Sequence, residues 1–322
     1  MHAVGLNSYG GPEVLHLVAL PDPHPGPGQV RVKVRAAGIN PVDVMVRDGS
    51  LAGWFAEAQP PFVPGMDIAG TIDELGEGID PQSGVAVGDD VVGVVDNFGG
   101  YGGYSQYVCL PAASVIAVPA SLTFSAAASF LMNALTARNA LDTLRLPRRS
   151  TVLVTGAADA VGAYTLALGN DEGLRMVAIA APQDEAFLGS AGAADVIVRG
   201  ENVAARVRHA YPTGVNAVVD AAGLGKQIVS AILDNGTVIT LRRGTDDSFE
   251  RGIKGVFVNV RERITDHVAM ARLGQQVTSG LLAVRVAAVF PATEAVAAHR
   301  RLNEGGLRGR IVLDFDGLGD RR

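Results

Sequence analysis

The chain of 322 residues has one cysteine, Cys109, which excludes an internal disulfide. Its first residues, MHAVGLNSYGG, contain neither a basic segment nor an apolar segment of the kind found in secretory signals. These two absences favour a cytoplasmic location. Long apolar runs are also missing, since DVVGVV and FLMNAL are far shorter than the roughly 20 residues that cross a bilayer. We therefore expect no membrane segment.

Metal ligands and basic clusters are equally scarce. The six histidines are scattered, and the sequence has no His-x-x-x-His or Cys-x-x-Cys spacing, which leaves a zinc site with almost no ligands. The formal net charge is −6, and acidic and basic residues are interspersed except in short clusters such as Arg148-Arg149 and Arg242-Arg243. A nucleic-acid face normally requires a clustered basic patch. The sequence thus predicts neither a metal site nor a nucleic-acid partner.

Apolar residues and glycine are abundant instead, at 48% and 40 residues, with only 5% aromatics. This composition is typical of a soluble α/β protein, and the length fits two domains. The first 120 residues contain short strand-like runs separated by Gly and Pro, namely QVRVKVRAAGI, GMDIAGTIDELG, GDDVVGVV, YSQYVCL and SVIAVP. The regular turn signals between them predict an antiparallel, barrel-like β domain.

The pattern changes near Ser125. Residues 125–144, SAAASFLMNALTARNALDTL, have the length and composition of a helix, and Pro147 follows its end. Apolar strands then alternate with helices expected from Val161, over 184–191 and over 203–210. The strand-like runs are TVLVTG, RMVAIA, DVIV, VNAVVDAAG and GTVITL. Such alternation predicts a parallel sheet covered on both faces, which is the doubly wound, Rossmann-type, nucleotide-binding architecture.

The last part of the chain returns to a β-rich pattern. A long helix is expected over 264–279, followed by the strand VRVAAVF, a helix over 294–303 and the strand GRIVLDF. We therefore predict an α/β fold in which a Rossmann-type dinucleotide-binding domain, residues 123–265, is inserted in a β-rich substrate and catalytic domain. That second domain comprises residues 1–122 and 266–322.

A set of short sequence segments, spread over nearly the whole chain, resembles segments of a known family of proteins. The segments are AAGINPVDVMVRDG, PFVPGMDIAGTIDELGEGI, GGYSQYV, LTARNAL, VLVTGAADAVG, AVVDAAG, NGTVITL and GRIVLDF. In this order they resemble the zinc-independent, quinone-oxidoreductase-like branch of the medium-chain dehydrogenase/reductase superfamily, whose β domain is GroES-like. Zinc-dependent members carry Gly-His-Glu near the place where this chain has Gly65-Met66-Asp67.

The resemblance implies hydride transfer without a metal. NADPH or NADH would reduce a quinone, an enone or another activated double bond, with the small-molecule substrate bound in the cleft between the domains. A homodimer built by joining the sheets of two cofactor domains is common among relatives, although nothing else in the sequence indicates one.

The same resemblance implies which residues serve the reaction. Asn40 and Thr136 fall at positions that lie by the nicotinamide or the substrate, which makes them the candidate catalytic residues. Phe257 and Val258 correspond to a backbone stretch that meets the carboxamide. From the residues alone, Asn40 and Pro41 could equally form a turn in which the asparagine bonds its own backbone. Thr136 could equally bond back to its own helix.

Asp43 and Arg47 stand four residues apart, shortly after Asn40. The favoured interpretation is an ion pair on a helix surface, which contributes a few tenths of a kcal/mol. Such a pair has no part in the chemistry.

Reduction of an enone also requires a proton. Relatives in the enoyl-reductase group are thought to use a tyrosine after the RxG segment or a bound water. The corresponding segment here, RDGSLAGWF, offers Trp54 and Phe55 but no tyrosine. Tyr101 and Tyr104 are nearby alternatives, and each could equally be an aromatic of a strand or loop. The proton donor stays unassigned.

The stretch VTGAADAVGA, residues 154–163, is an altered glycine-rich turn. Gly156 and Gly162 fit the tight strand-to-helix turn and the close packing of helix on strand. Asp159 stands where relatives place a glycine that faces a phosphate, and two unit charges about 4 Å apart at an effective dielectric near 20 repel by about 4 kcal/mol. Alternatively, Asp159 caps the helix that begins near Ala160, which adds about 1 kcal/mol. The predicted cofactor-binding residues are Gly156, Ala157, Ala158, Asp159, Ala160, Val161, Gly162, Ala180, Arg242, Phe257 and Val258.

Two further departures concern charge. After Ala180, where NADPH-using relatives often place Ser and Lys to meet the 2′-phosphate, this chain has Asp184 and Glu185. Arg242 stands where a glycine often borders the nicotinamide. It could block the cofactor, pair with a phosphate or an acidic substrate, or lie with Arg243 in an exposed loop.

Three hypotheses follow. The first, which we favour, is an NAD(P)H-dependent quinone or enoyl reductase whose turn tolerates Asp159. The second is an enzyme on the same scaffold that has lost the nicotinamide and acts as a cyclase, isomerase or lyase on an unsaturated metabolite. The third is a binding protein without enzymatic activity. Fold alone does not choose among them.

Overall fold

The computed structural model describes residues 1–80, 84–98, 100–242 and 249–319. The chain divides into two compact units. Unit 1 comprises Met1–Met132, Ile264–Thr278 and Val284–Arg322, and unit 2 comprises Asn133–Arg263 and Ser279–Ala283. The first division thus comes after Met132 rather than after residue 122, because the short helix α2 (Phe124–Ala127) packs on strands of unit 1.

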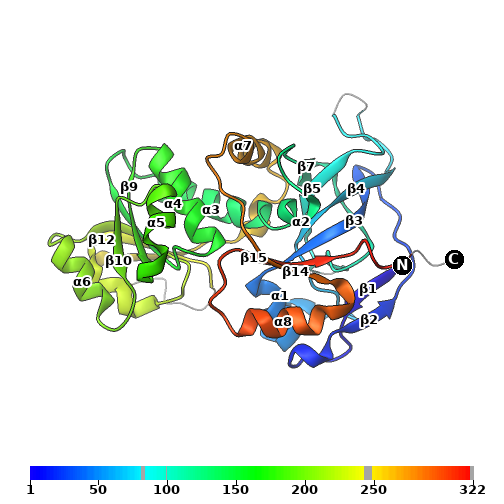
Figure 1. The fold of residues 1–322 in the computed structure, drawn as a ribbon, viewed down its shortest axis with the longest axis horizontal. Coiled ribbons are helices and arrows are strands. Elements are labelled where there is room, and N and C mark those ends of the chain that lie inside the picture. Colours follow the sequence, from blue (N-terminus) through cyan, green and yellow to red (C-terminus); the bar gives the residue numbers. More distant parts are fainter. Residues whose placement is uncertain (81–83, 99, 243–248, 320–322) are drawn as a thin grey trace. The chain divides into compact units, whose positions relative to one another are not determined.

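Unit 1 is built on a seven-stranded sheet with the order β14-β15-β3-β4-β5-β7, in which β6 also pairs with β3 (Figure 1). All pairs are antiparallel except β14 with β15. A separate two-stranded sheet joins β1 to β2. The strands are β1 (His2–Gly5), β2 (His16–Ala19), β3 (Gln29–Ile39), β4 (Asp67–Leu75), β5 (Asp90–Val94), β6 (Tyr107–Pro111), β7 (Val115–Ala117), β14 (Val286–Pro291) and β15 (Arg310–Asp314).

The central strand β3 shows why this sheet forms. Its residues alternate between buried and partly exposed over most of its length, which is the period of a strand with one face on a core. Val30, Val32 and Val34 join one apolar cluster that also contains Ile311 and Leu313 of β15. The C-terminal strands therefore complete the core that the N-terminal strands begin.

The helices that carry unit 1 residues differ in part from those expected. They are α1 (Pro41–Asp48), α2, the start of α3 (Leu131–Leu144), α7 (His267–Thr278) and α8 (Ala295–Asn303). The single helix expected over 125–144 is wrong, since α2 ends at Ala127 and α3 begins at Leu131. A contact explains the break: a Cβ on Gly38 would lie 2.2 Å from the Ala128 carbonyl oxygen, so β3 and this turn meet backbone to backbone.

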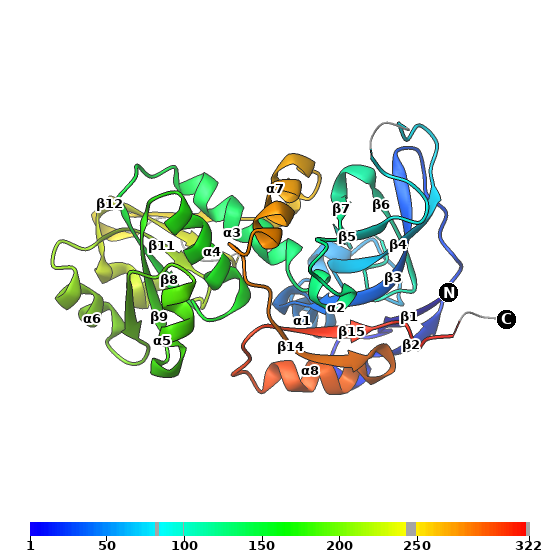
Figure 2. The same ribbon diagram turned by 45° about the horizontal axis from the view of Figure 1, so that its top comes forward.

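Unit 2 contains a six-stranded parallel sheet with the order β10-β9-β8-β11-β12-β13 (Figure 2). The strands are β8 (Thr151–Thr155), β9 (Arg175–Ala180), β10 (Asp195–Val198), β11 (Val215–Asp220), β12 (Ile232–Thr240) and β13 (Lys254–Phe257). This order reverses between β8 and β11, as in the doubly wound dinucleotide-binding fold. The expected Rossmann-type sheet is confirmed, and β13 adds a strand that we had not expected.

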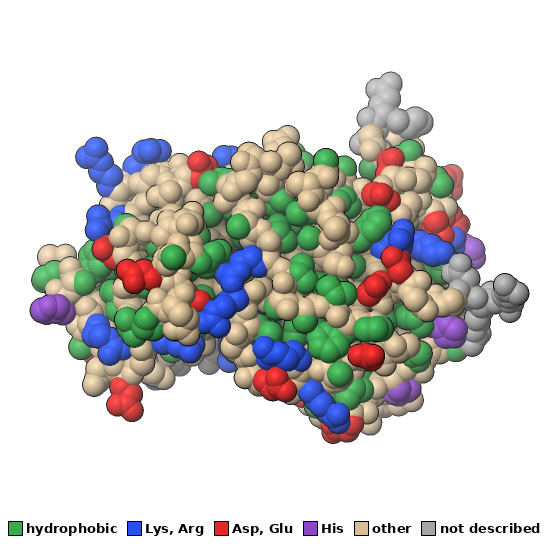
Figure 3. Space-filling view, viewed as in Figure 1, with side chains coloured by type: hydrophobic (Ala, Val, Ile, Leu, Met, Phe, Trp, Pro, Cys, Tyr) green, Lys and Arg blue, Asp and Glu red, His purple; other side chains and the backbone are tan. Residues whose placement is uncertain are grey.

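Helices α4 (Ala160–Asp171), α5 (Glu185–Ser190) and α6 (Val203–Ala210) follow β8, β9 and β10 in the sequence and pack against strands of the sheet. Apolar side chains of the strands and of α6 form the core. Within the described part of the chain, no helix is both long and apolar enough to span a membrane. Acidic and basic side chains are interspersed on the face shown in Figure 3.

The remaining helical turns are short 3-10 segments between these elements. They are Pro12–Val14, Ala52–Phe55, Ala112–Ser114, Pro182–Asp184, Gly225–Ala231, Glu250–Gly252, Val260–Arg263 and Ala292–Glu294.

Candidate active site

The glycine-rich turn joins β8 to α4 in unit 2. Gly156 has a φ of +61°, in the left-handed region that favours glycine, and a Cβ there would lie 3.2 Å from the Ala222 backbone nitrogen. A Cβ on Gly162 would lie 2.4 Å from the Gly156 carbonyl oxygen. The turn therefore needs both glycines for its shape, whatever it binds.

Asp159 occupies the N-cap position of α4 with extended backbone angles, φ −86° and ψ 172°. Its side chain accepts no capping hydrogen bond from the helix, so the expected cap is wrong. The first turn is closed by the backbone instead, because Ala163 N–H donates to the Asp159 carbonyl at 2.9 Å, and Asp159 takes part in a further interaction. The partly exposed carboxylate thus stands at the turn without closing it.

Two residues that the sequence interpretation missed hold the neighbouring loop. The Thr155 hydroxyl donates to Asp220 at 2.5 Å and accepts from Ala222 N–H at 2.9 Å. The Asp220 carboxylate also accepts the N–H groups of Leu224 and Gly225, at 3.0 and 2.8 Å. Both residues are polar and end an apolar strand, which was the signal available in the sequence. Together they fix the loop beside the glycine turn.

Arg242 lies two residues after the end of β12 and is exposed. Its backbone N–H donates to the Thr240 hydroxyl at 3.2 Å. Its guanidinium carbon lies 3.5 Å from the place that a Cβ on Gly223 would take. Arg242 therefore sets a positive charge over the loop that follows β11. Arg243 lies outside the described residues.

The end of β9 carries the residues expected near a 2′-phosphate. Ala180 ends the strand and is buried, and a 3-10 turn over Pro182–Asp184 follows. Asp184 is buried and takes part in an interaction, whereas Glu185 is exposed. The negative charge expected from the sequence is therefore present beside this strand end.

Phe257 ends β13 and Val258 follows it. Val258 N–H donates to the Thr240 carbonyl at 3.0 Å, so this stretch runs beside the end of β12. Helix α3 adjoins the same region, because the Asn139 side chain donates to the Asn259 carbonyl at 3.2 Å. Thr136 lies one turn earlier on α3 and is largely buried.

Parallel strands bring their carboxyl ends to one edge of a sheet, and ligands of such folds bind there. The structure therefore gathers the predicted residues of unit 2 at this edge. They are Gly156, Ala157, Ala158, Asp159, Ala160, Val161 and Gly162 after β8, Ala180 in β9, Arg242 after β12, and Phe257 and Val258 at β13. Asn40 belongs to unit 1.

Asn40 is buried at the start of α1. Its side-chain nitrogen donates to Asp67 at 3.1 Å, and it is also the N-cap residue of a capping box with Asp43, so the asparagine takes part both in the turn and in a buried contact. Its backbone N–H donates to the Asp43 carboxylate at 2.8 Å. Asp67 also accepts Met132 N–H at 2.9 Å, at the start of α3. Two carboxylates therefore hold Asn40.

The expected surface ion pair of Asp43 and Arg47 is also wrong. The two residues are 0% and 4% exposed, and they turn to other partners. Asp43 accepts Gly65 N–H at 2.9 Å, and Arg47 donates to His299 Nδ1 at 3.1 Å and to the Gly10 carbonyl at 3.2 Å. Helical spacing is compatible with a surface pair, but it does not report burial, which packing against the rest of unit 1 decides.

Burial shifts the titration of this cluster. It raises the pKa of Asp43 to about 7, against the opposing effect of the N–H groups of Asn40 and Gly65. Burial likewise raises the pKa of Asp67 to about 6. Burial and the Arg47 charge lower the pKa of His299 to about 3, so this imidazole is neutral at physiological pH.

The two tyrosines considered as proton donors differ in access. Tyr104 is completely buried, and its hydroxyl lies 3.3 Å from Asp43 and 3.3 Å from His299 Nε2. Burial raises the pKa of Tyr104 well above its ordinary value. Tyr101 is 42% exposed.

Trp54 and Phe55, the aromatic residues that stand where relatives have a tyrosine, pack on Phe98. The ring centroids of Trp54 and Phe98 lie 4.5 Å apart, and those of Phe55 and Phe98 lie 5.3 Å apart.

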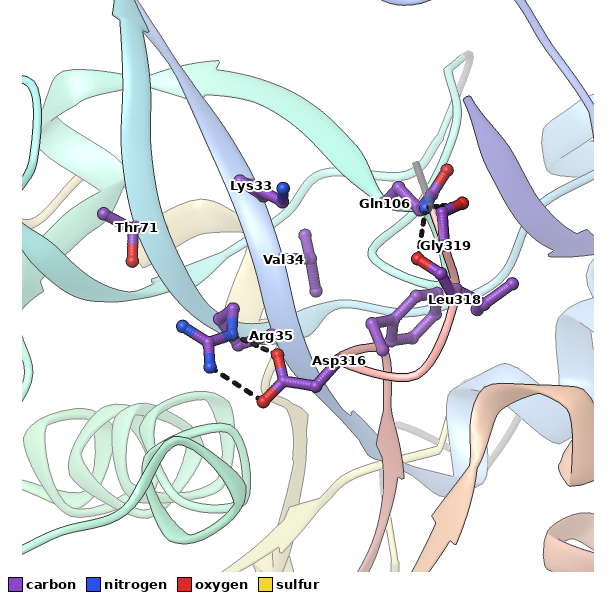
Figure 4. A pocket seen from close by; sticks show the side chains of 9 residues that line it. Lys33, Val34, Arg35, Thr71, Gln106, Asp316, Leu318 and Gly319 are labelled. Atoms are coloured by element: carbon purple, nitrogen blue, oxygen red, sulfur yellow. Dashed lines mark hydrogen bonds and ion pairs between the residues drawn. The ribbon is translucent and has the colours of Figure 1, made fainter. Parts of the chain in front are cut away.

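A pocket of about 450 Å³ opens elsewhere in unit 1, over strand β3 (Figure 4). Arg35 pairs with Asp316 at its edge, and Gln106 donates to the Leu318 carbonyl at 2.9 Å. None of the predicted site residues lines it. Within the described ranges, no three His, Cys, Asp or Glu side chains are grouped to hold a metal ion.

A Rossmann-type sheet with a glycine turn, joined to a unit built on an antiparallel sheet, is the architecture of a nucleotide-dependent dehydrogenase or reductase. Comparison with family models agrees with this class. Residues 26–120 match the alcohol dehydrogenase GroES-like domain, and residues 191–313 match the zinc-binding dehydrogenase model.

Individual relatives narrow the class. The quinone oxidoreductase of Coxiella burnetii is 28% identical, with a TM-score of 0.87 over 98% of this chain and 99% of that one. A mycobacterial protein solved in complex with NADPH is 27% identical, with a TM-score of 0.85 over 98% and 100%. The mouse synaptic vesicle membrane protein VAT-1 homolog-like is 34% identical over 163 residues, which span 50% of this chain but only 37% of the mouse protein.

The chain belongs to the quinone-oxidoreductase-like branch of the medium-chain dehydrogenase/reductase superfamily, a group of oxidoreductase enzymes. The resemblance stated from the sequence is thereby confirmed.

Proposed function

We propose that the protein transfers hydride from NADPH or NADH to a quinone, an enone or another activated double bond, without a metal. The observation that carries the proposal is the glycine turn at the carboxyl edge of the parallel sheet, with its two structurally required glycines. The similarity to a quinone oxidoreductase and to a protein complexed with NADPH supports the same reaction class.

The turn fits a dinucleotide in shape. A helix N-terminus attracts anions because its first N–H groups have no partner within the helix, and α4 begins directly after the turn. The Asp159 carboxylate opposes this attraction, and the exposed guanidinium of Arg242 offsets it over the adjacent loop. We infer that the pyrophosphate binds at this turn with lowered affinity.

The remaining residues of the site orient the cofactor and the substrate and enclose them. Thr155 and Asp220 hold the loop after β11, and the backbone at Phe257 and Val258 offers polar groups to a carboxamide. When bound, the nicotinamide supplies the hydride. Asn40 and Thr136 position the nicotinamide or the substrate, because rate gains in such transfers come largely from orientation.

A binding titration tests the proposal. Purified full-length chain is titrated with NADPH and, separately, NADH, and the fluorescence of the reduced nicotinamide is followed. We expect saturation at micromolar cofactor, together with cofactor oxidation when 1,4-benzoquinone is added. Absence of binding at millimolar cofactor would overturn the proposal.

One observation favours a second candidate. Asp159 in the turn and Asp184 in the 3-10 turn after β9 bring carboxylates to the places where we expect the phosphates of a dinucleotide. A scaffold that has lost the nicotinamide would act as a cyclase, isomerase or lyase on an unsaturated metabolite, or as a binding protein without enzymatic activity. Turnover without cofactor supports the former, and ligand binding without turnover supports the latter.

The assembly is a further part of this proposal. β13 is an edge strand of the parallel sheet, and we propose that two chains associate through such an edge into a homodimer. Sedimentation of the purified chain at the mass of a monomer would contradict this assembly.

A further inference from the structure

A directional chain of hydrogen bonds runs through the core of unit 1 and ends at Asn40. Arg47 can only donate, so His299 Nδ1 must accept from it, and neutral His299 therefore carries its proton on Nε2. That proton points to the Tyr104 oxygen, 3.3 Å away. The Tyr104 hydroxyl then donates to Asp43 Oδ2, which also receives the Asn40 N–H.

The chain thus joins a buried positive charge to a buried negative one through two neutral groups. Hydrogen bonds in such a series polarise one another, so the Arg47 charge acts on Asp43 although the two side chains do not meet. Helix α8 supplies His299, helix α1 supplies both charges, and Tyr104 comes from the segment before β6. The other charged group that acts on Asp43 is Asp67, whose effect opposes ionisation.

The ionised Asp43 carboxylate fixes the start of α1 by accepting three hydrogen bonds. Its Oδ1 accepts the Gly65 N–H, and its Oδ2 accepts the Asn40 N–H and the Tyr104 hydroxyl. These three donors occupy three of the roughly four lone-pair sites of the carboxylate, and protonation removes the negative charge that strengthens their hydrogen bonds. Protonation therefore weakens the hydrogen bonds that fix the start of α1.

We propose that the chain Arg47, His299, Tyr104 and Asp43 is a positioning network, which holds Asp43 ionised so that the Asn40 amide keeps its orientation for hydride transfer. The proposal rests on the reductase function proposed above. The four residues act through Asn40 and touch neither cofactor nor substrate.

Tyr104→Phe tests the network, because it removes one hydroxyl and keeps the ring. The matched control is Tyr211→Phe, the same change at a tyrosine of unit 2 whose hydroxyl also donates to a carboxylate, that of Asp195. We measure kcat/KM for 1,4-benzoquinone reduction by NADPH against pH. In the wild type and in the control, activity should fall as Asp43 protonates below about pH 7. In Tyr104→Phe this inflection should move up by about one pH unit, with activity recovered at higher pH.

A second measurement does not depend on enzyme activity. Urea unfolding of Tyr104→Phe and wild type is compared at pH 5.5 and pH 8. Loss of the donor should destabilise the protein more at pH 8, where Asp43 is charged, than at pH 5.5, where it is protonated. Equal destabilisation at the two pH values would indicate packing alone and would overturn the network.

The two measurements separate the two proposals. A wild type that binds and oxidises no NADPH contradicts the reductase function, while the unfolding comparison still decides the network. A wild type that turns over normally, with an unshifted profile in Tyr104→Phe, contradicts the network and leaves the function intact.

Discussion

Asp159 is the residue on which we expect cofactor affinity to depend most directly. It brings a carboxylate to the start of α4, where a dinucleotide places a doubly charged pyrophosphate. The side chain makes no capping hydrogen bond, so its charge stabilises the helix only through the helix dipole. Arg242, over Gly223, is the nearby positive charge that we expect to compensate.

Replacing Asp159 with asparagine should tighten NADPH binding. The full repulsion of two unit charges about 4 Å apart corresponds to about a thousandfold in Kd, and partial exposure screens it, so we expect about tenfold or more. Asp159→Gly should gain at least as much, because it also clears the approach to the turn. Fluorescence titration at two salt concentrations measures both variants. An affinity unchanged in both would mean that the carboxylate lies away from the phosphates.

A second prediction at this scale concerns Gly162. Its Cβ in Gly162→Ala would meet the Gly156 carbonyl oxygen and the Ala157 Cα, at 2.4 and 2.6 Å. Moving these backbone atoms costs energy, so we expect a loss of about 1–3 kcal/mol in unfolding free energy and weaker cofactor binding. Gly189→Ala in α5 is the control, since a Cβ there meets nothing within 4 Å and helix propensity favours alanine. Equal urea midpoints for the two variants would contradict the prediction.

At the scale of elements, β8 and β11 are joined beyond their backbone ladder by the Thr155 hydroxyl. It donates to Asp220 and accepts from Ala222 N–H, so it ties the glycine turn to the loop after β11. We expect the order of the loop after β11 to depend on this side chain together with the Asp220 carboxylate.

Thr155→Val keeps the shape and removes both hydrogen bonds. Buried polar groups left without partners cost about 1–3 kcal/mol, so we expect a lower unfolding free energy and faster amide exchange over residues 221–225. Thr143→Val on the exposed side of α3 should change neither. Hydrogen exchange followed by mass spectrometry measures the loop. Protection that is the same in both variants would show that the loop is held by other contacts.

Most elements could be predicted because their signals are local. Alternation in β3 and the apolar strands of the parallel sheet are visible in short windows of sequence. The break between α2 and α3 could not be predicted, because it arises where the Ala128 carbonyl meets Gly38, a residue far away in the chain. β13 was missed because its four residues, KGVF, include a glycine and show no alternation.

The site residues also divide into those with local signals in the sequence and those whose environment depends on distant segments. Gly156 and Gly162 could be interpreted from spacing, since the turn they form is local. Asp43 was misjudged because its partners, Tyr104 among them, come from distant segments. Spacing along a helix shows which residues share a face, and only tertiary packing decides whether that face is buried.

At the scale of the whole molecule, three buried titratable groups of unit 1, Asp43, Asp67 and His299, contribute to the pH dependence of stability. The pKa values of Asp43 and Asp67 are raised by burial to about 7 and about 6, so each binds more protons folded than unfolded above pH 4. His299, with its pKa lowered to about 3 by burial and by Arg47, binds fewer protons folded than unfolded below about pH 6.5.

Between pH 4.5 and 6 the two carboxyl groups outweigh the imidazole by roughly 0.7 proton. The unfolding free energy should therefore fall as pH rises, by about 1 kcal/mol per pH unit from these groups. Urea midpoints at pH 4.5 and 6 measure the slope, and Asp43→Asn should flatten it. A wild-type stability that rises over this interval would contradict the assignment.

The pairing of β15 with β3 also bears on the order in which the molecule folds. Ile311 lies opposite Ile39, so β3 cannot complete its pairing in the sheet of unit 1 until residues 310–314 have left the ribosome. Unit 2 has its own parallel sheet and core within Asn133–Arg263, and it has all these strands available earlier. During synthesis the parallel sheet of unit 2 can therefore fold first. One edge of β3 stays unpaired until β15 has been made.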